Sequence, residues 1–87
     1  MPFRVEFAAA ASKALEDLPK NDHRRIVARA EALAADPHPP GSMKLQGAED
    51  LWRVRVGVYR IVYAIDDGKL VVLVVRIGHR REVCRRR

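Results

Sequence analysis

Three arginines stand at positions where the side chains of two neighbouring strands would converge. Arg53 and Arg55 alternate with valines in the segment 51–56, so both fall on one face of a predicted strand. In the next predicted strand, 59–65, the face that carries tyrosine and isoleucine packs inward, and Arg60 takes the opposite face. Side chains that face each other across an antiparallel pair lie about 5 Å apart at Cβ. Because like charges this close repel, we interpret the three arginines as a site for a phosphate group rather than as a solvated strand face.

An arginine site of this kind is suited to RNA cleavage. The ribose 2′-hydroxyl is a nucleophile held next to the scissile phosphate, so the protein needs to orient it, stabilise the transition-state charge and assist proton transfer. Arginine stabilises the negative charge of the transition state well, but it is a poor base because its pKa exceeds about 12. His79 lies at the end of the last predicted strand and could move protons near neutral pH. A histidine that only positions phosphate or is merely exposed is an equally good interpretation.

The charge distribution points to a polyanionic partner. The chain has 87 residues, 17 Lys+Arg and 11 Asp+Glu, for a net charge of +6. Residues 1–50 are slightly acidic, whereas residues 51–87 hold ten of the basic residues and three of the acidic ones. Most of the basic residues are arginines, whose planar guanidinium pairs bidentately with phosphate. Nucleic acid is the commonest partner of such a surface.

Length and composition exclude several classes of protein. We expect residues 1–87 to form a single domain, too small for a Rossmann or TIM-barrel enzyme. Cys84 is the one cysteine, which excludes an intrachain disulfide and a thiolate zinc site. We find no pattern for a metal or an organic cofactor. The amino terminus does not resemble a signal peptide, and no apolar run could span a bilayer, so we expect a cytoplasmic protein without membrane contact.

The elements that position the arginines follow from periodicity. An alternating strand at 3–7 precedes a helical hairpin at 8–35, in which Asn21 or Asp22 should cap the second helix. After a loop at 37–50 come strands 51–56, 59–65 and 70–77, the last of them buried on both faces. Gly68 should adopt a positive φ in the turn 66–69. The prediction is an α+β fold: an N-terminal strand, an α-helical hairpin and a three-stranded antiparallel meander, in one sheet with the helices on one face.

An ordered set of short segments resembles the RelE branch of the RelE/ParE toxins. The strongest stretches are 51–67, LWRVRVGVYRIVYAIDD, and 75–83, VRIGHRREV. Upstream, Leu18-Pro19, Asp36-Pro37, PPGS at 39–42 and KLQG at 44–47 also match, so the resemblance covers nearly the whole chain. It implies the RelE-like fold and the toxin of a type II toxin–antitoxin system. RelE-like toxins cleave mRNA in the ribosomal A site and leave a 2′,3′-cyclic phosphate, without a metal or cofactor.

The resemblance also implies roles for individual residues. Arg53, Arg55, Arg60 and Arg80 match catalytic positions, and Arg60 would stabilise the transition state. Arg81 is an alternative to Arg80 because the spacing is ambiguous. Many members carry a tyrosine that stacks on a base where this chain has Cys84. That position makes Cys84 a further candidate catalytic residue, although we favour a surface thiol over a nucleophile. The residues expected to bind RNA are Lys44, Arg53, Arg55, Arg60, Arg80, Arg81 and Arg85.

The expected partners are a cognate RelB-like antitoxin, the ribosome and mRNA. A disordered antitoxin segment should wrap the toxin, and operator DNA should be bound only through the antitoxin complex. Two other functions stay open. One is inhibition of DNA gyrase, as in the ParE branch. The other is a catalytically weak toxin that acts mainly as the partner of its antitoxin and of the operator complex.

Overall fold

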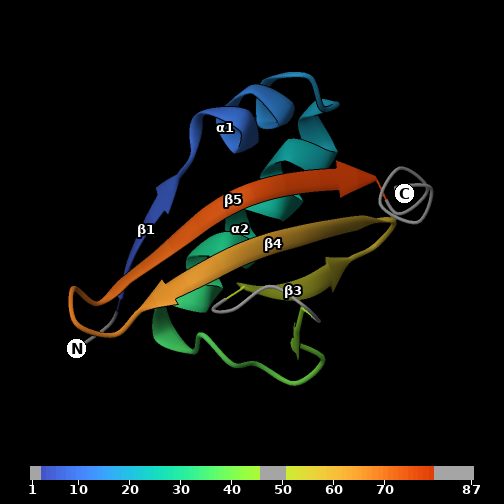
Figure 1. The fold of residues 1–87 in the computed structure, drawn as a ribbon. Coiled ribbons are helices and arrows are strands. Elements are labelled where there is room, and N and C mark those ends of the chain that lie inside the picture. Colours follow the sequence, from blue (N-terminus) through green and yellow to red (C-terminus); the bar gives the residue numbers. More distant parts are fainter. Residues whose placement is uncertain (1–2, 46–50, 80–87) are drawn as a thin grey trace.

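The structure is a computed structural model, and it describes residues 3–45 and 51–79. Two helices, α1 (Ala9–Glu16) and α2 (Lys20–Ala35), follow the first strand. The strands are β1 (Arg4–Phe7), β2 (Met43–Lys44), β3 (Leu51–Val56), β4 (Tyr59–Asp66) and β5 (Val71–His79). They form one sheet in the order β1-β5-β4-β3-β2, in which β1 pairs parallel with β5 and the other neighbours are antiparallel. The predicted α+β class is confirmed (Figure 1).

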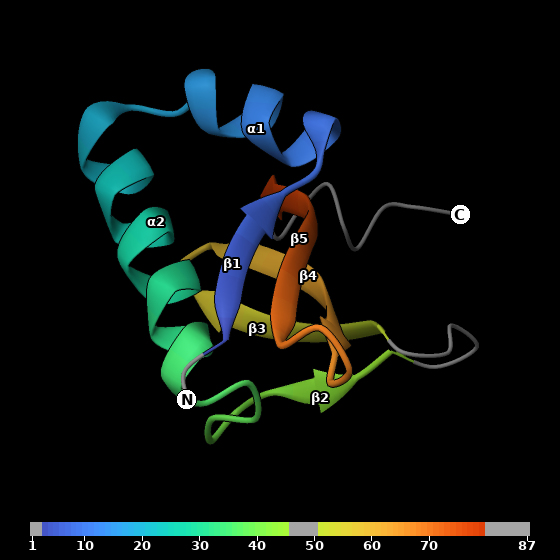
Figure 2. The ribbon, with the colours of Figure 1, turned by 90° about the vertical axis from the view of Figure 1, so that its left-hand side faces the viewer.

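Both helices lie on one side of the sheet, as Figure 2 shows. Helix α2 contributes Ile26, Ala30 and Leu33 to the core, and α1 contributes Ala11 and Leu15. They pack on the fully buried strand residues Val54, Ile61, Tyr63, Val72 and Val74. We call the other side of the sheet the open face, because no described helix covers it.

Four details of the sequence prediction are wrong. Helix α2 starts at Lys20 with Pro19 as its N-cap, so neither Asn21 nor Asp22 caps it. Proline suits this boundary because it cannot donate a backbone hydrogen bond to a preceding turn. Leu70, not Gly68, adopts the positive φ of the β4–β5 turn, at 55°. Strand β5 is not buried on both faces, since Arg76 is exposed. The sheet also contains the two-residue strand β2, which lies within the predicted loop.

The β3–β4 connection sets the register on which the arginines depend. Gly57, with φ 61°, and Val58 form a two-residue turn between β3 and β4. Glycine at the first position suits the tight turns whose twist matches that of the flanking strands. The resulting register pairs Val56 with Tyr59 and Arg55 with Arg60. A side chain at Gly57 would also require the flexible end of Arg25 of α2 to move, because its Nη2 lies 2.7 Å from the place of a Cβ atom.

An irregularity in β5 changes which side chains face the open side. Tyr63 pairs with Val74 and Val62 pairs with Arg76, so Val75 is an extra residue in the ladder. Such a β-bulge reverses the alternation of side chains beyond it. Val72 and Val74 face the helices before the bulge, and Ile77 does so after it. Arg76, which strict alternation from Val74 would direct into the core, is therefore exposed on the open face.

Candidate anion-binding site on the open face

Arg53, Arg55 and Arg60 share the open face of strands β3 and β4. Arg55 is the direct register partner of Arg60, and Arg53 is the partner of Val62. The inward-facing neighbours Val54 and Ile61 are 1% and 0% exposed, so the apolar side of each strand holds the arginine side outward. The structure thus brings together the three arginines that the sequence predicted to converge.

These arginines line a small hollow of about 70 Å³. Its other lining residues are Gly41, Met43 and Val54. Arg53 and Arg60 are half-buried and Arg55 is exposed. The ion pairs found among residues 3–45 and 51–79 join Arg4 to Glu6 and Arg25 to Asp22, so neither neutralises the three arginines. The hollow therefore presents concentrated positive charge that an anion such as phosphate would offset.

Arg76 extends this positive region and was missed as a functional candidate in the sequence. Through the bulge it becomes the partner of Val62, which is itself the partner of Arg53. A row Arg53–Val62–Arg76 therefore runs across three strands, beside the row Arg55–Arg60–Gly78. The available signal was a charged residue interrupting the apolar run of β5. We call Arg53, Arg55, Arg60 and Arg76 the basic end of the open face.

A loop supports the rim of the hollow. The Tyr63 hydroxyl donates a hydrogen bond of 2.8 Å to the carbonyl of Pro37, and the rings of His38 and Trp52 meet edge to face at 4.5 Å. Burial raises the pKa of the Tyr63 hydroxyl above its usual 10.0, although a hydrogen bond with Ser42 opposes the rise. The neutral, donating hydroxyl is the favoured form. Tyr63 therefore anchors the segment that leads to Gly41 and Met43.

Two predicted site residues lie on the other face of the sheet. His79 pairs with Tyr59, and their rings meet edge to face at 5.6 Å. Tyr59 donates a hydrogen bond of 2.9 Å to Asp22 of α2, which shows that this pair lies on the helix side. Lys44 pairs with Trp52, so it alternates away from Arg53. The structure does not bring His79 or Lys44 together with the three arginines.

Four further predicted residues fall outside the described part of the chain. Residues 1–2, 46–50 and 80–87 are not described. Arg80, Arg81, Cys84 and Arg85 therefore remain expectations from the sequence. Within the described residues, no group of three or more His, Cys, Asp or Glu side chains could hold a metal ion. None of the helices in that part is long and apolar enough to cross a membrane.

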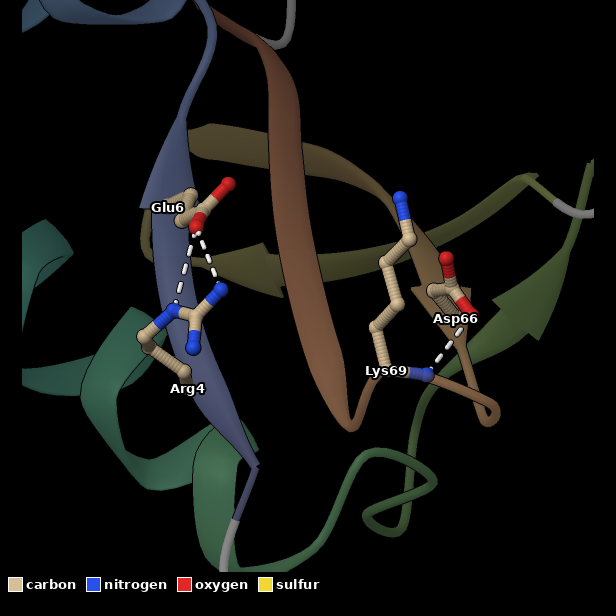
Figure 3. Close-up of polar contacts among 4 residues, drawn as sticks. All are labelled: Arg4, Glu6, Asp66 and Lys69. Carbon is tan, nitrogen blue, oxygen red and sulfur yellow. Dashed lines mark hydrogen bonds and ion pairs between the residues drawn. The ribbon is translucent and has the colours of Figure 1, made fainter.

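The opposite end of the open face has a different character. A hollow of about 630 Å³ there has an apolar floor of Ala64, Val71 and Leu73. We call its charged residues the mixed end; they are Arg4, Glu6, Asp66, Asp67 and Lys69. Figure 3 shows Arg4 and Glu6 turned toward each other on β1, joined by an ion pair of 3.0 Å. Across the hollow, Asp66 accepts a hydrogen bond of 3.1 Å from the Lys69 backbone N–H.

Known proteins are similar to this chain in sequence and in fold. The family described as "ParE toxin of type II toxin-antitoxin system, parDE" matches residues 5–84. Toxin RelG of Mycobacterium tuberculosis is 31% identical over 87 residues, which cover 99% of this chain and 100% of RelG. The archaeal RelE–RelB complex from Pyrococcus horikoshii OT3 contains a chain with TM-score 0.80 and 32% identity, covering 92% of this chain and 97% of that one.

A second solved structure gives the same result. A chain of the toxin–antitoxin complex RelBE2 from Mycobacterium tuberculosis has TM-score 0.81 and 30% identity, with 92% of this chain and 100% of that chain covered. The chain therefore belongs to the RelE/ParE superfamily and is a RelE-family toxin of a type II toxin–antitoxin system.

Proposed function

We propose that this toxin is an endoribonuclease that cleaves mRNA in the ribosomal A site and so inhibits translation. The observation that supports the proposal best is the meeting of Arg53, Arg55 and Arg60 on one open face, at a hollow that no acidic residue lines among residues 3–45 and 51–79. Three guanidinium groups around one small hollow suit a phosphate whose negative charge increases during the reaction. Acting on ribosomes places the toxin in the cytoplasm.

The proposed reaction uses the RNA's own nucleophile. The 2′-oxygen forms a bond to the adjacent phosphorus, the bond from phosphorus to the 5′-oxygen breaks, and a 2′,3′-cyclic phosphate and a 5′-hydroxyl result. One proton leaves the 2′-hydroxyl and one reaches the 5′-oxygen. Arg53 and Arg55 would hold the scissile phosphate, and Arg60 would stabilise the added negative charge. The reaction as written uses no metal ion and no cofactor.

Arginines are poor bases, so this proposal assigns much of the rate to positioning. The ribosome would hold the mRNA backbone so that the 2′-oxygen is in line with the breaking bond. By the resemblance to RelE toxins, Arg80 would join the phosphate contacts, with Arg81 as its alternative and Arg85 and Lys44 as further RNA contacts. His79 is a weaker candidate for proton transfer, because it lies on the face opposite the arginines. Cys84 is assigned no chemical step.

The proposal includes a cognate antitoxin of the RelB kind as the neutralising partner. The solved relatives from Pyrococcus horikoshii and Mycobacterium tuberculosis are toxin–antitoxin complexes, which supports a partner of this class. Binding of operator DNA would then belong to the complex rather than to the toxin alone.

The decisive experiment is cleavage of mRNA on programmed ribosomes by the purified toxin. We expect new mRNA ends in the A-site codon, a 2′,3′-cyclic phosphate on the upstream product, and no cleavage of the same mRNA without ribosomes. Arg60→Ala should abolish cleavage, whereas Arg24→Ala, at an exposed arginine of α2, should retain it. Intact mRNA at toxin concentrations that block growth would disprove the proposal.

Inhibition of DNA gyrase is the second candidate, because the matching family is described by the ParE name. A supercoiling assay with purified gyrase tests it directly. Loss of supercoiling together with intact ribosomal mRNA would favour that function. If the toxin neither cleaves mRNA nor inhibits gyrase but binds its antitoxin tightly, the result would favour a toxin that acts mainly in the antitoxin and operator complex.

A further inference from the structure

Met43 combines an apolar side chain with high exposure at the edge of the arginine hollow. Its exposed fraction is 55%, the highest among the large hydrophobic residues of the described part of the chain. Moving a methionine side chain out of water lowers the free energy of the protein, so this exposure is unfavourable in the free protein. The position therefore suggests a contact that forms only when a ligand occupies the hollow.

The geometry places Met43 against the arginines. In the pairing of β2 with β3, Met43 is the direct partner of Arg53, so both side chains point to the open face. The Met43 Sδ lies 3.7 Å from Arg53 Nη2. Met43 also lines the hollow together with Arg55 and Arg60. Any phosphate held by these guanidinium groups would thus have a thioether beside it.

The backbone around Met43 is well anchored despite the exposure of the side chain. Tyr63 holds the carbonyl of Pro37 from below, and the Ser42 N–H donates a bond of 3.0 Å to the Pro39 carbonyl. Gly41 turns the chain with a φ of 93°, a conformation that favours glycine. These contacts fix the position of Met43 at the rim of the arginine hollow, as a specific ligand contact requires.

The chemistry of the side chain fits a nucleobase. A thioether is polarizable and makes favourable contacts with aromatic rings, and it adapts to rings of different size. In RNA every phosphate has a base attached one ribose away. We propose that Met43 packs against the base next to the phosphate held by Arg53, Arg55 and Arg60, and so influences which nucleotide is accepted. This inference rests on the proposed function and adds a base-contacting residue to it.

The first test observes Met43 directly. The chain has two methionines, so methyl-labelled methionine gives two NMR signals, and Met43→Leu identifies the one of interest. The probe is a short single-stranded RNA with 2′-O-methyl groups, which prevent cleavage. We expect an upfield ring-current shift of the Met43 methyl with this RNA, and none with the same RNA lacking one base or with inorganic phosphate. An equal shift with inorganic phosphate, or no shift with a bound RNA, would overturn the proposal.

The second test measures nucleotide preference on programmed ribosomes. Met43→Ala should reduce the ratio between the best and worst A-site codons by about twofold to tenfold, the range expected for one sulfur–aromatic contact. Met43→Leu, which keeps an apolar side chain of similar size, should retain most of the preference. Leu70→Ala is the control, because Leu70 is an exposed apolar residue in the turn before β5 and does not line the arginine hollow. The melting temperature of each variant checks that folding is intact.

The outcomes separate this inference from the proposed function. A base-dependent methyl shift without ribosomal cleavage would support the base contact and reject the nuclease. Cleavage with an unchanged codon profile in Met43→Ala would reject the base contact and leave the nuclease standing. An effect of Met43→Ala on antitoxin affinity alone would also reject it, since Met43 would then be a protein contact. If no RNA binds and no mRNA is cleaved, both proposals are wrong.

Discussion

The two ends of the open face belong to the same sheet but differ in how their charges are arranged. One end has opposite charges side by side, and the other has like charges side by side. At the mixed end, Arg4 is paired with Glu6 at 3.0 Å, and carboxylates and cations share the rim of the hollow. At the basic end, Arg55 and Arg60 are direct cross-strand partners, and no acidic residue of the described part of the chain lines their hollow. Paired charges offset each other in the free protein and need no bound ligand. Unpaired like charge is a cost of the free protein, and it is offset when an anion binds.

The sharpest test of this contrast removes one arginine from each end. Arg55→Ala should lower the single-turnover rate of mRNA cleavage by about 100-fold, because the scissile phosphate would lose a group that holds it in the reactive position. Arg4→Ala should change the rate by less than about twofold, because an exposed ion pair contributes little. Similar losses in the two variants would show that the ends do not differ in function.

Tyr63 tests the support beneath the basic end. Tyr63→Phe removes the bond to the Pro37 carbonyl, so we expect a loss of about 1 kcal/mol in the free energy of unfolding. That corresponds to a melting temperature lower by about 4–8 °C for a domain of this size. Urea unfolding checks the first value and thermal unfolding the second. An unchanged stability would mean that the loop is held by other contacts.

The raised pKa of Tyr63 gives the same variant a pH signature. Because its folded pKa lies above 10.0, its contribution to stability is complete below pH 10 and is lost as the pH rises through the folded pKa. Wild-type stability should therefore fall more steeply than that of Tyr63→Phe as the pH rises beyond 10. Unfolding curves of both proteins from pH 8 to pH 11 measure the difference.

Removing charge at the basic end should stabilise the fold. Arg55→Gln relieves the repulsion with Arg60, and we expect a gain of about 0.2–1 kcal/mol in the free energy of unfolding. The gain should shrink in 1 M salt, because salt screens exposed charges. A loss of stability at both salt concentrations would indicate that Arg55 packs favourably against its neighbours.

Removing charge at the mixed end should have the smallest effect and the opposite sign. Glu6→Gln breaks the ion pair with Arg4 and should cost no more than about 0.5 kcal/mol, because both side chains are largely exposed. A double-mutant cycle with Arg4→Ala isolates the pair. A coupling energy of several kcal/mol would contradict the view that this end is an ordinary paired surface.

Much of this arrangement follows from residue periodicity, and the exceptions have physical reasons. Alternation with valine places Arg53 and Arg55 on one face, and the Gly57 turn brings Arg60 opposite Arg55. Strand β2 is only two residues long, too short for any period to be recognised. The bulge lies in a run of apolar residues, where both faces look alike, so periodicity could not predict that Arg76 joins the face of Arg53. The roles of the arginines in chemistry came from the family resemblance.

The extra residue in β5 changes which residue numbers face the helices on its two sides. Val72 and Val74 occupy inward positions of even number, and beyond Val75 the inward position is the odd-numbered Ile77. Deleting Val75 would bring the two halves of the strand back into one phase. Arg76 would then follow Val74 directly, so regular alternation would keep Arg76 on the open face and Ile77 toward the helices. With Val75 present, the sheet accommodates three steps on β5, from Val74 to Ile77, opposite two steps on β4, from Tyr63 to Ile61. Removing the bulge residue should therefore change the local bend and twist of β5 without changing which of these side chains face the helices.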